Sequence, residues 1–508
     1  INVTVGSSTF TINTPSQGLG ETTVLMKSDQ SSLNAGDWYF YPDDGYPILQ
    51  GMAYSSGYYM IEDAKDLAFF PELLSFSTEL NGLNFSNANY KLVSNIDMGI
   101  LPNGIYKTPM VTFNGEFIGT NDSAIDQSDH YYIYNLHQTD FLGINSKVYA
   151  GLFSVLGNGS LVKDLNIIRS SIAIDETNDF YSYDVFVGGI AGEMIAATIE
   201  DVYIDMDIDL GQDALGSIHL GGLVGRASGL IQRVSNHGLL NVNNHSYTPT
   251  TSPVKGQHYI GGIVGKSANA KLVLDEVANR GGISSFDTSS SMTLASGSNL
   301  NVYTGGIIGY LNYNDLYIPE FSDIVNSGDI TLNSVANPAN NSGIQYMGGL
   351  IGLLEGDAPL LEDNGDILFA NFINQGQVIY DFDTSSIEVY ASGILNANLD
   401  ESYDFALLKN YGSFNYDSSG ASFSDFTYAG IINDLGNVDF TLSRVYQYGQ
   451  QVYDSSVYEK TYGMVTSLNN NNILLRYSAN YGDVLFMDNN GDTSINLNND
   501  LKISAITD

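Results

Sequence analysis

The sequence predicts an all-β chain folded as a parallel β-helix, a solenoid, with a helix-containing cap before its repeats. A short glycine-rich apolar phrase recurs along the chain at intervals of about 33–44 residues, which indicates stacked repeat units. An Asn-x-Gly phrase recurs within the same units, and the segments between are rich in β-branched and aromatic residues. The glycine phrase occupies 188–192, 221–225, 261–265, 305–309 and 348–352, with weaker copies at 392–395 and 429–432.

The first 50 residues read as an N-terminal strand, a linker and closing strands. Apolar and polar residues alternate through Ile1, Val3, Val5, Phe10 and Ile12, as in an edge strand. Residues 15–20 are typical of a linker because they contain proline and two glycines. Strands are then expected around Trp38 and around 46–49.

Residues 51–147 are predicted to form a cap and the leading rungs of the solenoid. The segment 61–76 is the best helix candidate, because Ala64, Leu67, Phe70 and Leu74 fall on one face. Pro71 is expected to break or kink that helix. Strands follow at 90–93, 96–98, 113–119 and 131–136.

The repeat array is predicted over 148–490, with a C-terminal strand or tail at 491–508. Each unit is expected to contain a Gly-Gly strand, a strand ending in Asn-x-Gly, and a third strand with a polar loop. Such strands cannot bury a face alone, but stacked in parallel they share one apolar interior. The asparagine of each corner is expected to adopt left-handed backbone geometry and to form an amide ladder with the rung above. The Asn-x-Gly copies lie at 236–238, 279–281, 326–328, 374–376, 410–412 and 480–482.

These phrases resemble the GLUG motif of bacterial surface proteins. The resemblance extends over roughly 61–482 and includes Leu92–Asp97 and Phe113–Gly119. It implies a right-handed β-helix on a large exported, adhesin-like or fibrous protein. It implies no particular ligand, and no His-Glu-x-x-His zinc motif is present.

Composition narrows the function classes. The formal net charge of −39, from 18 Lys+Arg against 57 Asp+Glu, argues against nucleic acid and anionic membranes as partners. The absence of cysteine favours export, and no apolar run is long enough to span a membrane. An extracellular, cell-surface location is therefore expected, with a glycan or other surface ligand, or copies of the same chain, as partners.

Two acidic segments suggest a cation site, with calcium as the candidate ion. Alternating aspartates share one face of a strand and could bind a hard cation. A plain solvent-facing strand explains the same pattern, and the C-terminal segment, which departs from a calcium loop, also reads as a turn. The candidate ligands are Asp205, Asp207 and Asp209, and separately Asp488, Asn490 and Asp492. The six histidines lack ligand spacing and are expected on the surface or in loops.

Three functions remain open. The preferred one is a non-enzymatic adhesin-like or structural rod, for which Tyr181 and Tyr183 are candidate ligand contacts, since tyrosine binds at low entropic cost. The first alternative is a subunit of a surface filament or layer, joined end to end or by addition of the N-terminal strand. The second is a polysaccharide-degrading β-helix enzyme with paired carboxylates.

Overall fold

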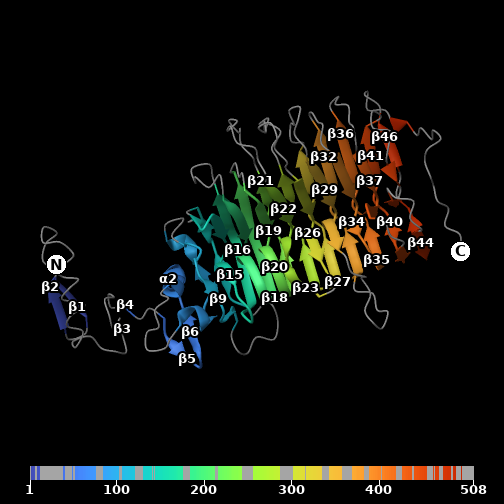
Figure 1. The fold of residues 1–508 in the computed structure, drawn as a ribbon. Helices are drawn as coiled ribbons and strands as arrows, with labels where there is room; N and C mark the ends of the chain where they lie inside the picture. Colours follow the sequence, from blue (N-terminus) through green and yellow to red (C-terminus); the bar gives the residue numbers. More distant parts are fainter. Residues whose placement is uncertain are drawn as a thin grey trace.

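The computed structural model is an elongated coil of parallel strands, which confirms the predicted β-helix (Figure 1). The structure describes most of the chain from residue 52 to residue 494. It describes 2–5, 8–11, 38–39, 48–49, 52–75, 84–101, 106–120, 130–174 without 140 and 142, 183–211, 216–242, 256–285, 301–333 without 315, 343–356, 369–382, 388–418 without 402, 426–436, 440–454, 461–462, 464–467, 473–476, 478–481, 484–487 and 493–494.

Each rung of the coil contributes strands to four parallel columns. The first column is a separate sheet that begins at β14 (Lys147–Ala150), where β13 (Gly143–Ile144) pairs antiparallel to it. The sheet continues through β17 (Asp184–Gly188), β19 (Ile218–Gly221), β22 (Gln257–Gly261), β25 (Asn301–Gly305), β29 (Ile344–Gly348), β33 (Glu388–Ser392), β37 (Phe426–Ala429) and β42 (Thr461–Tyr462).

The other three columns belong to one large sheet, because long strands bend from one column into the next. These strands are β16 (Leu161–Ile174), β18 (Ala191–Leu210), β20 (Val224–Asn236) and β23 (Val264–Asn279). The second column also holds β9 (Thr112–Phe113), β15 (Phe153–Leu156), β26 (Ile308–Tyr313), β30 (Ile351–Gly356), β34 (Leu395–Leu399), β38 (Ile432–Asp434) and β43 (Val465–Ser467).

The third and fourth columns complete each turn. The third holds β6 (Tyr58–Ile61), β7 (Asn89–Leu92), β8 (Ile96–Asp97), β10 (Glu116–Ile118), β11 (Tyr132–Tyr134), β27 (Glu320–Asn326), β31 (Phe369–Asn374), β35 (Tyr403–Asn410), β39 (Phe440–Ser443), β40 (Tyr446–Gln447), β44 (Ile473–Arg476) and β45 (Ala479–Asn480). The fourth holds β12 (His137–Gln138), β21 (Leu240–Val242), β24 (Ile283–Ser285), β28 (Ile330–Asn333), β32 (Val378–Phe382), β36 (Phe414–Ser418), β41 (Gln451–Asp454) and β46 (Val484–Met487), followed by the antiparallel β47 (Thr493–Ser494).

The Gly-Gly phrase forms a corner rather than a strand, which corrects one expectation. Strand β17 ends at Gly188 and β18 begins at Ala191, so Gly189 and Ile190 make the turn between the first and second columns. Backbone from the next rung approaches closely here. A Cβ atom on Gly189 would lie 2.9 Å from the carbonyl oxygen of Gly222. Glycine is therefore required at this corner by space.

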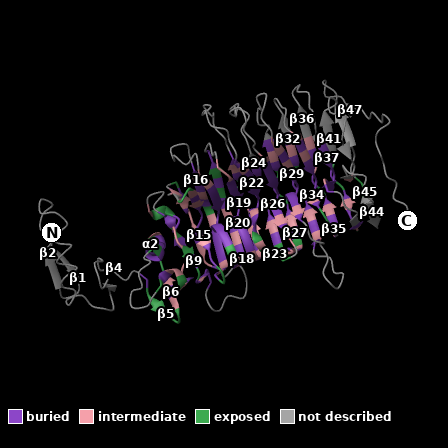
Figure 2. Cartoon of the chain, viewed as in Figure 1, coloured by how far each residue is buried: buried purple, intermediate pink, exposed green. Residues whose placement is uncertain are grey.

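Equivalent positions of the repeats align in register, as predicted. Gly221 pairs with Gly261, which pairs with Gly305, and Asn236 pairs with Asn279 in the same way. The interior is filled by Ile, Leu, Val and Phe side chains from all four columns, and Figure 2 shows buried residues along the length of the coil. The rungs therefore share one continuous apolar core.

The predicted amide ladder is present in this interior. The Nδ2 atom of each asparagine donates to the Oδ1 of the next across 2.9–3.0 Å, and the last step reaches Oε1 of Gln447. All members are fully buried. They are Asn236, Asn279, Asn326, Asn374, Asn410 and Gln447.

The left-handed corner residue lies elsewhere than expected. The ladder asparagines are not among the described residues with positive φ; the residue three positions earlier has that geometry. Its side chain points away from the core and varies in type, so the sequence gives no fixed signature at this position. These residues, with φ between 51° and 60°, are Arg233, Glu276, Asp323, Asn371, Leu407 and Arg444. Asp164 and Asp201 have the same geometry at the equivalent position of the two preceding rungs, which carry no ladder asparagine.

The predicted helix is α2 (Ala64–Ser75), and it covers the first rungs of the coil (Figure 1). Leu67, Phe70 and Leu74 are fully or almost fully buried on one face. Asp63 begins the helix, since its Oδ1 accepts hydrogen bonds from the backbone N–H groups of Lys65 and Asp66. The helix continues past Pro71 to Ser75, so the proline does not end it.

Hairpins and short helices account for the remaining elements. The first predicted strand is a hairpin of β1 (Asn2–Val5) and β2 (Ser8–Thr11), in which Val3 pairs with Phe10. Strands β3 (Trp38–Tyr39) and β4 (Ile48–Leu49) form a second antiparallel pair, and β5 (Tyr54–Ser55) pairs with β6. Two 3₁₀ turns, Phe85–Asn87 and Met98–Ile100, lie among the first rungs.

Candidate functional site

A column of stacked rings runs along the outside of the first strand column, and we call it the aromatic column. Neighbouring ring centroids lie 4.4–5.5 Å apart, and neighbouring planes are within 22° of parallel. Face-to-face contact covers the ring faces inside the column, and the inner rings Phe186, His219, Tyr259 and Tyr303 are buried. The members are Tyr149, Phe186, His219, Tyr259, Tyr303, Tyr346 and Tyr390.

Strand alternation places these rings outside the core. In β17, Val185 and Val187 are buried on either side of Phe186, and their partners in the next rung, Ile218 and Leu220, also face inward. Each ring lies two residues before the first position of the glycine corner, as Tyr259 does before Gly261. Sequence reasoning missed this column, although an aromatic-x-Gly pattern repeated through the units is its signal.

A row of polar and charged side chains from the second strand column borders the aromatic column. Arg226 forms an ion pair with Glu193 at 3.3 Å, and Glu193 is almost completely buried. The ammonium of Lys266 lies 4.1 Å from the ring centroid of Tyr259 and 5.1 Å from that of Tyr310. It also donates a hydrogen bond to the Tyr259 hydroxyl at 2.9 Å. The bordering row therefore holds the rings by cation–π and hydrogen-bond contacts.

The aromatic column and the row of side chains beside it shift the pKa values of several ionisable groups. Burial, with Arg226 close by, lowers the pKa of Lys266 to about 8. Burial and three nearby cations lower the pKa of His219 well below its usual range, so His219 is neutral at pH 7. Burial and the hydrogen-bonded carboxylate of Glu193 raise the pKa of Tyr149 to about 12. Perturbed groups gathered at one place mark a candidate functional site, although structural ion pairs produce the same effect.

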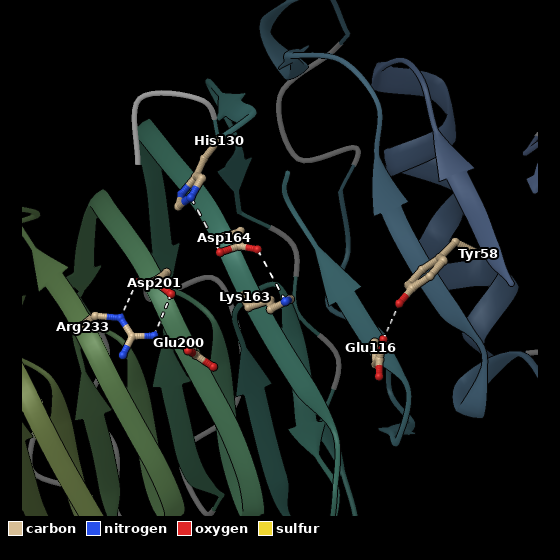
Figure 3. A network of polar contacts seen from close by, with 8 residues as sticks. All are labelled: Tyr58, Glu116, His130, Lys163, Asp164, Glu200, Asp201 and Arg233. Atoms are coloured by element: carbon tan, nitrogen blue, oxygen red, sulfur yellow. Dashed lines mark hydrogen bonds and ion pairs between the residues drawn. The ribbon is translucent and has the colours of Figure 1, made fainter. Parts of the chain in front are cut away.

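A second, ionic network lies on the third strand column, at the left-handed corner residues (Figure 3). Arg233 donates to both Asp201 and Glu200 in the preceding rung. Asp164 lies 3.6 Å from His130 and 3.8 Å from Lys163. The contacts of Arg233 connect successive rungs from outside, whereas Lys163 and Asp164 are neighbours in β16. Their arrangement supports a stabilising role.

A third feature is a short stack of exposed tyrosines near the last rungs. Tyr411 and Tyr448 stack at 4.6 Å, and Tyr448 and Tyr481 stack at 5.1 Å. Each occupies the middle position of an Asn-x-Gly copy or of its relative, and between 40% and 63% of each side chain is exposed. Stacked exposed tyrosines of this kind are suited to contact with another molecule.

Three of the six predicted cation ligands lie among the described residues, and three lie outside them. Asp205 is half-buried and Asp207 and Asp209 are exposed, on alternate positions of β18 as expected. Among the described residues, no group of three or more acidic or histidine side chains is arranged to hold a metal ion. Asp207 instead accepts a hydrogen bond from the backbone N–H of Leu239 in the next rung. The other three candidates, Asp488, Asn490 and Asp492, lie outside the described residues.

The predicted contact residues are only partly visible. Tyr183 is half-buried and packs against the core, whereas Tyr181 lies outside the described residues. Val3, Val5 and Phe10 lie in the β1–β2 hairpin, whose side chains are not described. Ile1 and Ile12 lie outside the described residues.

The expectation that the histidines are surface or loop residues is wrong for three of them. His130, His219 and His258 are buried. His219 belongs to the aromatic column, where a ring of any kind stacks. His258 faces the interior, between Ile218 and Val302 of the adjacent rungs.

Comparisons with known proteins provide no assignment. Neither protein-family models, nor curated proteins, nor solved structures produced a match to this chain.

Proposed function

We propose that the chain is an extracellular, non-enzymatic rod of the GLUG-motif bacterial type that presents an adhesive or structural surface. The observation that supports this most directly is the pair of ladders along the coil. The buried amides connect successive rungs from Asn236 to Gln447, and the aromatic column connects them from Tyr149 to Tyr390. Such ladders add side-chain contacts at each rung to the backbone hydrogen bonds, as a stiff rod requires.

Surface chemistry supports a carbohydrate or protein partner rather than a polyanion. The net charge of −39 repels nucleic acid and anionic lipid surfaces. The exposed tyrosines Tyr411, Tyr448 and Tyr481 supply rigid contact area at low entropic cost. Among the described residues, no helix is long and apolar enough to cross a membrane.

The adhesive function is tested by binding of the purified chain to an array of glycans and to cultured host cells. We expect saturable binding that soluble glycan competes away. If binding to glycans and to cells is no greater than that of an unrelated acidic protein of similar size, the adhesive function is wrong. The structural function then remains and is tested separately.

A filament subunit is the second candidate, and the exposed stack of Tyr411, Tyr448 and Tyr481 favours it. These rings lie near the last rungs, where a second copy could add a further ring or strand. Helix α2 covers the first rungs, so head-to-tail stacking would have to displace the helix. Electron microscopy of the purified chain, with and without a calcium chelator, tests this candidate. Continuous filaments support it, and isolated rods in both conditions contradict it.

A further inference from the structure

The aromatic column ends at a pocket. Phe186 covers one face of the Tyr149 ring, at 5.1 Å and an interplanar angle of 21°. A pocket of about 260 Å³ is lined by Tyr149 and Lys147 but not by Phe186, and the Lys147 ammonium lies 5.3 Å from the Phe186 ring centroid. Its walls come from two successive rungs, because the lining residues Val155 and Thr112 pair across the second strand column.

Strand topology explains why the column stops there. Among the described residues, β14 is the first parallel strand of its sheet, and β13 pairs with its Val148 and Lys147. Among the described residues, no ring stacks on the face of Tyr149 opposite Phe186. The pocket thus adjoins Tyr149, the ring at which the described column ends.

We propose that this pocket binds one sugar ring that carries a carboxylate, stacked on Tyr149 with its carboxylate at Lys147. The inference rests on the adhesive function proposed above and names its ligand class. The ligand is a terminal acidic sugar of a glycan, because the pocket has room for one ring with its substituents. Its volume lies just below the roughly 300 Å³ at which pockets for drug-sized ligands begin.

The lining has the chemistry that such a ring needs. An aromatic face is electron-rich and attracts the weakly positive C–H groups on one face of a pyranose ring. Asn145 and Thr112 provide an amide and a hydroxyl within the pocket for sugar hydroxyl groups.

The positive charge of Lys147 favours an anionic sugar ring over a neutral one. Lys147 is the one charged residue among the lining residues that the structure describes, in a chain where Lys+Arg number 18 against 57 Asp+Glu. The described lining residues include no Asp or Glu, so they provide binding groups for a sugar ring.

The ring of Tyr149 is held in place before any ligand binds. The hydroxyl of Tyr149 hydrogen-bonds the carboxylate of Glu193, which is itself paired with Arg226 at 3.3 Å. The backbone at Gly192 also packs against the ring, since a Cβ there would lie 2.8 Å from Cδ1 of Tyr149. A ring fixed in this way loses little entropy when it binds a ligand.

The test titrates the full chain with two probes that differ only at the carboxylate, methyl β-glucuronide and methyl β-glucoside. Binding is followed by calorimetry and by saturation-transfer NMR. We expect the glucuronide to bind roughly tenfold more tightly than the glucoside, as one charge-assisted contact allows. Equal affinities for the two probes, or no binding of the glucuronide, would overturn the inference.

Variants locate the site. Lys147→Gln is expected to lower glucuronide affinity roughly tenfold and leave glucoside affinity unchanged. Tyr149→Ala is expected to abolish detectable binding of both probes, with circular dichroism confirming the fold. The controls are Lys271→Gln, an exposed lysine outside the pocket, and Tyr317→Ala, an exposed tyrosine outside the pocket; both should bind as the wild type does. Unchanged glucuronide affinity in Lys147→Gln would overturn the inference even if Tyr149→Ala fails to fold.

The same variants separate this inference from the proposed function. If the wild type binds cells and glycans but Lys147→Gln and Tyr149→Ala bind them equally well, the adhesive function holds and the pocket inference is wrong. If the wild type binds the glucuronide but no cell or array glycan, the pocket inference holds and the adhesive function is wrong.

Discussion

The side-chain amide of Asn236 donates a hydrogen bond to the backbone carbonyl of Gly262, 2.9 Å away in the next rung. The two recurring phrases of the sequence therefore meet inside the coil. A Cβ on Gly262 would lie 2.4 Å from the amide group of Asn279, the next member of the ladder. The second glycine of the phrase and the ladder asparagine thus occupy one shared space, so each restricts what the other position can carry.

Replacing a middle member of the ladder should be costly. Asn279→Ala removes the Nδ2 hydrogen bonds to Asn326 and to the carbonyl of Gly281, both 2.9 Å, and removes the acceptor for Asn236. We expect a loss of roughly 3 kcal/mol in the free energy of unfolding, because buried polar partners are left unpaired. Urea denaturation measures it. Asn241→Ala, at a half-buried position outside the ladder, is the control and should change stability by less than about 0.5 kcal/mol.

Glycine should be required at the corner between the first and second columns, because a Cβ atom has no room there. A Cβ on Gly262 would lie 2.1 Å from the carbonyl oxygen of Gly306, so Gly262→Ala must displace backbone. The expected cost is roughly 2–3 kcal/mol. Gly282→Ala is the matched control, since its Cβ would meet nothing closer than 3.4 Å. Equal unfolding midpoints for the two variants would contradict this account of the corner.

The buried histidine should make the fold sensitive to acid. Complete burial lowers the pKa of His258 to about 4, whereas the unfolded chain has the ordinary value near 6.5. Between these pH values the unfolded state binds more protons than the folded state, so stability falls as pH drops from about 6.5 to about 4. The contribution is about 3 kcal/mol over that window.

The measurement compares the wild type with His258→Val, a residue that matches Val302 in the next rung. Other titrating groups are common to both proteins, so the difference in their unfolding free energies isolates the histidine. We expect His258→Val to lose less stability than the wild type between pH 7 and pH 4.5. Parallel pH profiles for the two proteins would show that the buried histidine is not the cause.

The packing of helix α2 on the first rungs should depend on the ring of Phe70. Phe70 is fully buried and packs edge-on against Tyr90, Phe117 and Phe153, with centroids 4.8–5.8 Å away. Phe70→Ala should destabilise the protein by about 3–5 kcal/mol because it leaves a large cavity. Phe69→Ala, at the adjacent half-buried position, should cost clearly less in the same thermal or urea unfolding experiment. A similar cost for both would mean that the helix is not anchored through the Phe70 face.

Much of the fold could be predicted because repeats reveal register. Once Gly261 must lie over Gly221 and Asn279 over Asn236, the strand pairing of the whole array follows. The candidate site could not be predicted in the same way. The aromatic column contains Tyr, Phe and His at equivalent positions of the repeats, so its members share a position rather than a residue type. Sequence reasoning therefore placed His219 on the surface or in a loop.

The sequence by itself determined the parallel coil, the position of the helical cap and the amide ladder, because each depends on local pattern or on repetition at a fixed interval. Tertiary structure decided which residues make the corners, that His258 faces the interior, and where the aromatic column ends. Those features depend on the distance between rungs and on the point at which the first column begins to stack. The pocket beside Tyr149 is lined by residues of two successive rungs, and no single segment of sequence records that geometry.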